Sequence, residues 1–254
     1  MGACQVSDLS AFEITKKWPA QHPDRIQLYS LPTPNGVKIS VMLEETGLPY
    51  ELVPVDTRKG EQFTPEFRAI NPNSKTPALV DGDVTIFDSN AILLYLAEKT
   101  GRFLPANTPV LRGELLSWLM FVATGIGPYS GQAVHFRLFA PEPKEYPLKR
   151  YEFEAERHWG ILEERLGKQR YMVGDTYTIV DMAVWGWARA MTRIFGDHGW
   201  STRPNLKRLF DEVNARPAAA RAEALPERYK FKMEVDAEAR RHLYPTLAAM
   251  SGPS

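Results

Sequence analysis

The stretch Ile26-Gln27-Leu28-Tyr29-Ser30-Leu31-Pro32-Thr33-Pro34-Asn35-Gly36 decides the fold of this chain. Its first four residues form an apolar run that predicts a strand, and residues 37–46 have the apolar spacing of a helix. A turn rich in proline and small polar residues lies between them. Because a strand that ends beside a helix N-terminus leaves backbone N–H groups free for carboxylates and thiolates, we expect a ligand site at this junction.

Two later segments have the same character. Asn71-Pro72-Asn73-Ser74-Lys75-Thr76-Pro77 precedes a pair of apolar strands, and Phe87-Asp88-Ser89-Asn90-Ala91 opens an apolar helix. Each places small polar groups or a proline where one element gives way to the next. Three such junctions close together in the sequence predict one site for a small, anionic, peptide-like ligand.

The composition is that of an ordinary globular protein. Of its 254 residues, 44% are apolar and 24% are charged, enough for one large or two ordinary domains. Lys plus Arg and Asp plus Glu both number 31, so the net charge favours neither nucleic acid nor an acidic membrane as partner. We see no run of the ~20 apolar residues that a membrane helix needs, and no secretory signal. The single cysteine, Cys4, excludes an internal disulfide framework and favours a reducing compartment, so we expect a cytoplasmic protein.

The chain changes character near residue 105. Up to that point strand-like and helix-like pieces alternate, and the turn Asp81-Gly82-Asp83 predicts an antiparallel hairpin. The expected strands are residues 26–29, 50–55, 78–80 and 84–87, and the expected helices are residues 37–46, 65–70 and 89–99. The order βαβαββα is that of a thioredoxin-like domain.

Beyond this point only helical patterns remain. We expect helices at residues 111–126, 128–138, 149–166, 179–194 and 205–215. Gly125 to Pro128 should break the first of them, and Thr178 with Asp181 should form a capping box. The fold class is therefore α/β plus all-α: an N-terminal arm (1–25), a thioredoxin-like domain (26–104), an all-helical domain (105–225) and a C-terminal arm (226–254).

This organisation resembles the cytosolic glutathione transferases. Four motifs narrow the resemblance to the bacterial nu class, which is similar in turn to a fungal nitrogen-regulator prion with a transferase fold. The motifs are Thr33-Pro34-Asn35-Gly36, Gly60-Glu61-Gln62-Phe63, Gly127-Pro128-Tyr129-Ser130-Gly131-Gln132 and, behind Arg150, Tyr151-Glu152-Phe153-Glu154-Ala155-Glu156. The resemblance covers residues 26–225 and leaves out both arms.

The resemblance implies a glutathione site in the first domain. The Thr76–Pro77 bond should be cis, so that the Thr76 backbone can pair with the cysteinyl backbone of glutathione. Ser89 and free N–H groups suit the γ-glutamyl carboxylate, while Asp88 suits the ammonium group. A simpler explanation exists for each feature alone, since an X–Pro bond is usually trans and Asp or Ser before an apolar run usually caps a helix.

Three further residues complete the expected glutathione contacts. Gln62 and Lys75 could reach the remaining polar ends of the tripeptide. Arg150 occupies the place of a basic residue of the helical domain that contacts glutathione in the related class. On a polar helix face, however, an arginine is usually only solvated.

Catalysis requires the glutathione thiol, whose pKa is about 8.5, to become a thiolate. The nu-like pattern places Thr33 and Asn35 at the end of the loop, where a hydroxyl, an amide and a helix N-terminus would donate to sulfur. We favour these two over Tyr29, with Ser30 in reserve. Cys4 is too far upstream for a protein cysteine relay, so a disulfide reductase of this kind would take its thiolates from one or two bound glutathiones.

Three functions follow, and the first is favoured: a glutathione-dependent disulfide-bond oxidoreductase. The second is a transferase for apolar electrophiles, with side activity on peroxides and a pocket walled by Met120, Phe121, Tyr129, Phe136, Phe139 and Trp187. The third is a non-catalytic glutathione-binding regulatory protein. The scattered histidines show no metal-ligand spacing.

The resemblance also implies a homodimer, formed between one subunit's first domain and the other's helical domain. The terminal arms could wrap the partner or partly cover the cleft, with Trp18 and Phe231 as anchors.

Overall fold

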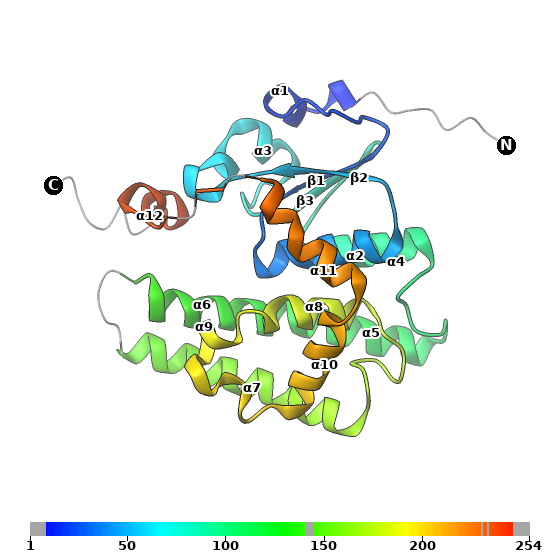
Figure 1. Cartoon of the computed structure of the whole chain (residues 1–254), viewed down its shortest axis with the longest axis vertical. Helices are drawn as coiled ribbons and strands as arrows, with labels where there is room; N and C mark the ends of the chain where they lie inside the picture. The colour runs from blue at the N-terminus through cyan, green and yellow to red at the C-terminus, as the bar shows by residue number, and fades with distance from the viewer. Residues whose placement is uncertain (1–8, 141–144, 230, 233, 246–254) are drawn as a thin grey trace.

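The computed structural model describes residues 9–140, 145–229, 231–232 and 234–245. Figure 1 shows two stacked units, with a small sheet and its helices above and a purely helical unit below. The expected fold class, a thioredoxin-like domain followed by a helical domain, is confirmed. Cys4 lies outside the described residues.

The sheet has the strand order β2-β1-β3-β4. Its strands are β1 (Ile26–Ser30), β2 (Tyr50–Pro54), β3 (Ala78–Asp81) and β4 (Val84–Phe87). β1 and β2 are parallel and are joined through helix α2 (Pro34–Thr46), whereas β3 is antiparallel to both β1 and β4. Every residue of β1 is buried because this central strand is covered on both faces. The C-terminal end of β1 is followed by a short loop and then by the N-terminus of α2.

Helices cover both faces of the sheet. Helices α2 and α4 (Ser89–Thr100) lie between the sheet and the helical unit, and α3 (Pro65–Ile70) and α1 (Ile14–Lys17) lie on the outer face (Figure 1). Within the N-terminal arm, Ile14 is fully buried and Trp18 packs edge-on against Tyr29 and Phe67. The described part of this arm therefore belongs to the core of its own thioredoxin-like domain.

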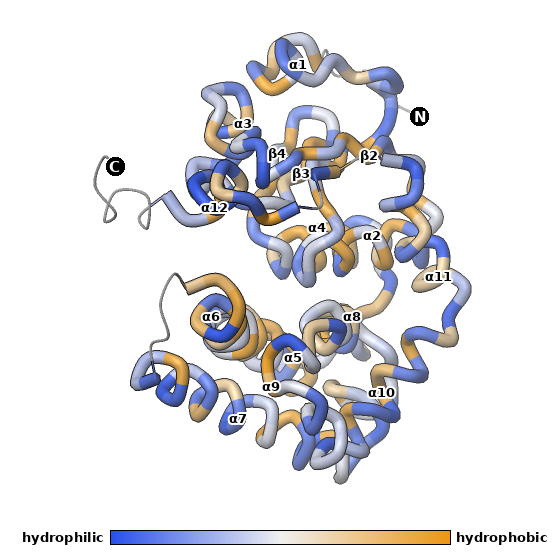
Figure 2. The backbone as a smooth tube through the Cα atoms, turned by 60° about the vertical axis from the view of Figure 1, so that its left-hand side comes forward, coloured by the Kyte–Doolittle hydropathy of each residue, from blue (hydrophilic) through white to orange (hydrophobic). Residues whose placement is uncertain are grey.

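The helical unit is built around α8 (Ile179–Ala188). The remaining helices are α5 (Pro109–Phe121), α6 (Gly127–Leu138), α7 (Glu145–Lys168), α9 (Met191–Phe195), α10 (Pro204–Asn214) and α11 (Pro217–Ala224). The expected capping box is present at the start of α8, where Asp181 accepts hydrogen bonds from the backbone N–H groups of Thr178 and Met172, each at 2.8 Å. Figure 2 shows the hydrophobic positions gathered where α5, α6 and α8 face one another.

Two expectations for this unit are wrong. The helix does not break at Gly125 to Pro128, because a π-helical segment (Val122–Ile126) carries it from α5 into α6. Pro128 has no N–H to donate to the preceding turn, and the wider π turn accommodates this missing hydrogen bond. Glycine is required at position 125, because a Cβ there would lie 2.3 Å from the His158 ring. The helix expected at residues 179–194 is two helices, α8 and α9.

The combined helix Pro109–Leu138 reaches the length and hydropathy of a membrane span by composition alone. In this fold it packs against α7 and α8 as part of the helical unit.

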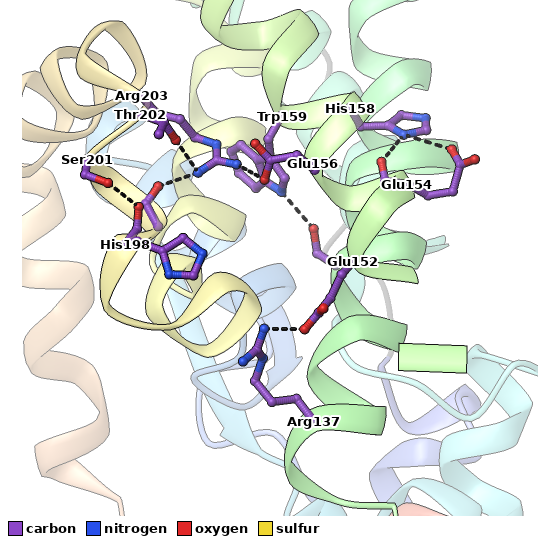
Figure 3. A network of polar contacts seen from close by, with 12 residues as sticks. Arg137, Glu152, Glu154, Glu156, His158, Trp159, His198, Ser201, Thr202 and Arg203 are labelled. Carbon is purple, nitrogen blue, oxygen red and sulfur yellow. Dashed lines mark hydrogen bonds and ion pairs between the residues drawn. The ribbon is translucent and has the colours of Figure 1, made fainter. Parts of the chain in front are cut away.

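Alternating carboxylates on α7 tie the helical unit together, as Figure 3 shows. Glu152 pairs with Arg137 of α6, and Glu156 pairs with the buried Arg203 just before α10. Between them, the Trp159 indole donates to Ser130 of α6 at 2.9 Å. Glu152 and Glu156 of the acidic motif singled out in the sequence thus make contacts between elements, whereas Glu154 pairs with Arg150 and Arg157 within α7.

The two units meet where α2 packs against α8 and α11. A Cβ on Gly186 of α8 would lie only 2.5 Å from the Pro34 carbonyl oxygen, so glycine is needed for this close approach. On the other side of α2, Arg221 of α11 donates to Glu44 at 2.6 Å and Arg216 pairs with Glu45. Gly186 thus lets α8 pack against the N-terminus of α2, and the two arginines hold the C-terminal end of α2 at Glu44 and Glu45.

Candidate functional site

Thr33 caps the N-terminus of α2. Its backbone is extended, Pro34 follows as the first helical residue, and its hydroxyl oxygen accepts a hydrogen bond from the Gly36 N–H at 3.1 Å. A hydroxyl that accepts in this way keeps its own proton to donate. Pro34 has no N–H, and the Gly36 and Val37 N–H groups bond to the Thr33 side chain and carbonyl, so Thr33 presents its O–H donor beside the Asn35 backbone N–H at the start of a 13-residue helix.

Asn35 lies in the first turn of α2 and is half-buried. Its side-chain oxygen accepts a hydrogen bond from the Trp187 indole N–H of α8 at 3.0 Å. Within the described part of the chain, no protein group accepts from the Asn35 side-chain NH₂. This NH₂ group is a second donor at the same helix end.

Tyr29 and Ser30 are placed differently. The Tyr29 side chain is fully buried, its hydroxyl has no partner among the described residues, and burial raises its pKa well above the usual value. Ser30 is 2% exposed and donates its hydroxyl to the Leu31 carbonyl at 3.4 Å. Neither hydroxyl is open to a ligand in the way that the Thr33 hydroxyl and the Asn35 side-chain NH₂ are.

The second junction has the expected backbone form, because the Thr76–Pro77 bond is cis. Thr76 is half-buried, and its backbone N–H and C=O make no hydrogen bond within the described residues. The exposed Lys75 is held by its carbonyl, which accepts from the Asn71 side-chain amide at 2.6 Å. The loop thus offers a free backbone edge next to β3.

Asp88 and Ser89 begin α4. Asp88 has φ 71°, a left-handed conformation that costs a non-glycine residue about 1–3 kcal/mol and is most often retained at functional sites. One of its carboxylate oxygens, Oδ1, caps the helix by accepting from the N–H groups of Asn90 and Ala91 at 2.9 and 3.2 Å. The simpler explanation of Asp88 as a cap is therefore correct, and it leaves the other oxygen, Oδ2, for a ligand.

Lys38 is a site residue that sequence reasoning missed. It lies in α2 beneath the start of α4, is 1% exposed, and donates to the Ser89 hydroxyl and the Asn90 side-chain oxygen, each at 3.3 Å. Burial lowers its pKa to about 7, against a smaller opposing effect of Asp88. The available signal was a lysine inside the otherwise apolar stretch of α2.

Gln62 is covered by the C-terminal arm. Its side chain is 4% exposed and donates to the carbonyl oxygens of Thr57 and His242 at 3.2 and 3.4 Å. His242 belongs to α12 (Ala237–Leu243), and Tyr244 just beyond packs on His135 of α6. The described part of this arm therefore spans both domains, and the NH₂ of Gln62 is occupied by the protein itself, whereas its buried side-chain oxygen has no partner among the described residues.

Arg150 lies apart from the other predicted residues. It is in α7, which α6 and α8 separate from the thioredoxin-like domain (Figure 1), and it donates to Glu154 at 2.7 Å. The strand pairs Tyr29–Ala78 and Ala78–Phe87 place the three predicted segments at the same end of the sheet, whereas Arg150 lies in the helical unit.

The aromatic residues expected to wall an apolar pocket mostly pack on other rings of the protein. Tyr129 and Phe121 pack on His158, and Phe136 stacks on Tyr151. Trp187 alone among them contacts the loop of Thr33 and Asn35. Among the residues that the structure describes, no group of three or more His, Cys, Asp or Glu is arranged to hold a metal ion.

Two family models match the chain. The glutathione S-transferase N-terminal domain matches residues 25–98, and the glutathione S-transferase C-terminal domain matches residues 125–217. Since these matches take in most of the chain and the fold agrees, the protein belongs to the glutathione S-transferase family of enzymes.

Individual relatives narrow this assignment. The disulfide-bond oxidoreductase YfcG of Escherichia coli K12 is 43% identical over 204 residues, which cover 78% of this chain and 94% of YfcG. A glutathione transferase of Burkholderia graminis, solved with two glutathione molecules bound per subunit, is 46% identical with a TM-score of 0.82 and covers 88% of this chain and 98% of its own. A glutathione transferase of Pseudomonas putida, solved with one glutathione disulfide bound per subunit, is 40% identical with a TM-score of 0.81. The match covers 87% of this chain and 100% of the Pseudomonas putida chain.

Proposed function

We propose that the protein is a glutathione-dependent disulfide-bond oxidoreductase. The observation that carries the proposal is the pair of donors at the N-terminus of α2: the Thr33 hydroxyl and the Asn35 amide, each with its oxygen already held by the protein. Two N–H or O–H donors beside a helix end suit a thiolate. The relative named as a disulfide-bond oxidoreductase, and the neighbours that hold two glutathiones or glutathione disulfide, support this choice.

The reaction uses two glutathiones and no protein cysteine. The thiolate of the first attacks one sulfur of a small disulfide, forms a mixed disulfide and releases a thiolate. The thiolate of the second glutathione then attacks the glutathione sulfur of the mixed disulfide and forms glutathione disulfide. The two released thiolates take up the protons that the two glutathione thiols lost, so two electrons pass from glutathione to the substrate.

Thr33 and Asn35 make the first thiolate available at neutral pH. A hydrogen bond to a charged group contributes roughly 1.5–3 kcal/mol, and each 1.36 kcal/mol lowers a pKa by one unit. Loss of either donor should therefore raise the bound thiol's pKa by about one unit or more, enough to leave most of it protonated at pH 7.

The rest of the tripeptide is bound by the first domain. The free backbone edge of Thr76 pairs with the cysteinyl unit. Ser89 and the free oxygen of Asp88 receive the γ-glutamyl carboxylate and ammonium groups, and Lys75 receives the glycyl carboxylate. Gln62 joins them where the C-terminal arm moves away, and Arg150 contributes from a partner subunit.

The substrate is a polar or anionic disulfide. A surface hollow beside the loop of Thr33 is lined by Pro32, Pro34, Arg189, Ala190, Arg193, Phe210 and Glu223. Arg189 is paired with Glu223 at 3.0 Å, so among the described rim residues the guanidinium group of Arg193 is the one left for a substrate carboxylate. A charged rim of this kind suits such substrates better than the apolar electrophiles of the alternative transferase function.

The working protein is a cytoplasmic homodimer. Apolar side chains are exposed on both domains, among them Phe87, which is 45% exposed, and Val110 and Phe153 in the helical unit. A two-fold contact between one subunit's first domain and the other's helical domain would cover both sets.

A paired assay tests the proposed function. One arm follows reduction of a small hydroxyalkyl disulfide coupled to glutathione reductase, and the other follows conjugation of a chlorinated dinitrobenzene. We expect disulfide reduction to dominate; dominant conjugation would favour the transferase, and silence in both arms with glutathione still bound would favour a regulatory protein.

Matched variants then test the donors. Thr33→Val should raise the bound thiol's pKa and slow disulfide reduction by tenfold or more. Thr108→Val is the control, since Thr108 also caps a helix with proline in the next position and accepts from the third residue on, at 3.2 Å, in α5. Both variants lose a cap worth about 1 kcal/mol, but only Thr33→Val should change the thiol.

A further inference from the structure

We propose that Trp187 is a positioning residue for catalysis: its indole N–H holds the Asn35 side chain so that the amide NH₂ faces the glutathione sulfur. This inference rests on the proposed function. It assigns to the helical domain an effect on the thiolate formed in the other domain, exerted through Asn35, which is 152 residues away in the sequence.

The orientation of Asn35 follows from the chemistry of its partner. An indole N–H can only donate a hydrogen bond, so the Asn35 atom that faces it at 3.0 Å must be the oxygen. The NH₂ group is then directed away from Trp187. Without the indole, the amide could turn over and present its oxygen to the thiolate, which would be repelled.

The indole itself lies against two glycines of α6. A Cβ on Gly127 of α6 would lie 3.2 Å from the indole nitrogen, and a Cβ on Gly131 one turn later would lie 3.6 Å from the far edge of the ring. These two positions leave a flat strip of α6 on which the ring lies. Gly186, next to Trp187, allows α8 to approach the Pro34 carbonyl.

Trp185 offers a matched control on the same helix. Its indole N–H donates to the side-chain oxygen of Asn214 at 2.7 Å, the same kind of bond inside the helical unit. Because Asn214 is at the end of α10 and not at the start of α2, this bond does not orient a donor toward the thiolate.

The test compares Trp187→Phe with Trp185→Phe in the full-length protein. The bound thiol's pKa is followed by the ultraviolet absorbance of the thiolate, and affinity is measured separately with S-methylglutathione, which has no thiol. We expect Trp187→Phe to raise the thiol pKa by about one unit, equivalent to tenfold less thiolate at neutral pH, with affinity for S-methylglutathione unchanged. Trp185→Phe should leave the thiol pKa at its wild-type value.

A double variant separates this inference from the proposed function. If Trp187 acts through Asn35, Trp187→Phe combined with Asn35→Ala should raise the thiol pKa no further than Asn35→Ala alone. Additive shifts, or an unchanged pKa in Trp187→Phe while Asn35→Ala raises it, would overturn the role of Trp187. An unchanged pKa in Asn35→Ala would instead overturn the proposed function.

A spectroscopic measurement covers the case in which Trp187→Phe does not fold. In the wild-type protein, the indole N–H of Trp187 should exchange slowly with solvent and shift when bound glutathione is titrated through its thiol pKa. Fast exchange, or no shift across that titration, would contradict the proposed bond.

Discussion

Replacing Lys38 with methionine should change how stability depends on pH. Lys38 is 1% exposed, and its hydrogen-bond partners are the neutral groups of Ser89 and Asn90. Burial lowers its pKa from 10.5 to about 7, and the carboxylate of Asp88 opposes this shift only in part. The folded protein therefore holds an ammonium group that is far easier to deprotonate than in the unfolded chain.

The sign of the effect follows from proton binding. Between pH 7 and pH 10 the unfolded chain keeps the Lys38 proton and the folded protein loses it, so the free energy of unfolding rises with pH. With pKa values of about 7 and 10.5, the wild type should gain about 2 kcal/mol from this group between pH 7 and pH 9. Lys38→Met lacks the group and should gain nothing from it.

The assay is denaturant unfolding without glutathione, at half-unit steps from pH 7 to pH 9. Other groups titrate alike in both proteins, so the difference between the two curves isolates Lys38. Lys16→Met, at a lysine whose side chain is 66% exposed, controls for the loss of one positive charge. Parallel curves for the wild type and Lys38→Met would refute the argument that Lys38 is a strained, buried ammonium.

Three further variants test contacts of the fold. Gly186→Ala places a methyl group 2.5 Å from the Pro34 carbonyl oxygen, so it should lower the free energy of unfolding by about 1–3 kcal/mol, measured by thermal unfolding. It should also lower kcat/KM for disulfide reduction, because the N-terminus of α2 is displaced. Unchanged activity would show that the site tolerates this displacement. Asp181→Ala leaves two buried backbone N–H groups unpaired and should cost at least about 2 kcal/mol in denaturant unfolding. Tyr29→Phe removes a buried hydroxyl without a partner among the described residues, so kcat/KM should not change; a tenfold loss would make Tyr29 the thiolate donor after all.

The order of elements was predictable because local patterns were strong. All four strands begin where the sequence predicts them, and the hairpin turn is at Asp81-Gly82-Asp83. The errors concern helix continuity and the helices α11 and α12, which were not predicted. The π-helical segment at Val122–Ile126 and the separation of α8 from α9 depend on what packs alongside, which spacing along one chain does not encode.

The residues of the candidate site also fall into those that local sequence patterns predict and those that only packing reveals. Thr33, Thr76, Asp88 and Ser89 could be predicted as candidates from sequence because caps and X–Pro bonds have local signatures. Lys38 could not, since a lysine in a helix is usually exposed and only the packing of α4 over α2 buries this one.

The sequence by itself determined the two-domain order, the capping residues and the donors at the start of α2, because each depends on neighbours a few residues away. Only the tertiary structure decided which way those donors point. The bond from Trp187 to Asn35, the burial of Lys38 beneath Ser89 and the cover of Gln62 by the C-terminal arm join segments that are far apart in the chain. Such contacts form only when the hydrophobic faces of both domains pack together, and no local pattern specifies their geometry.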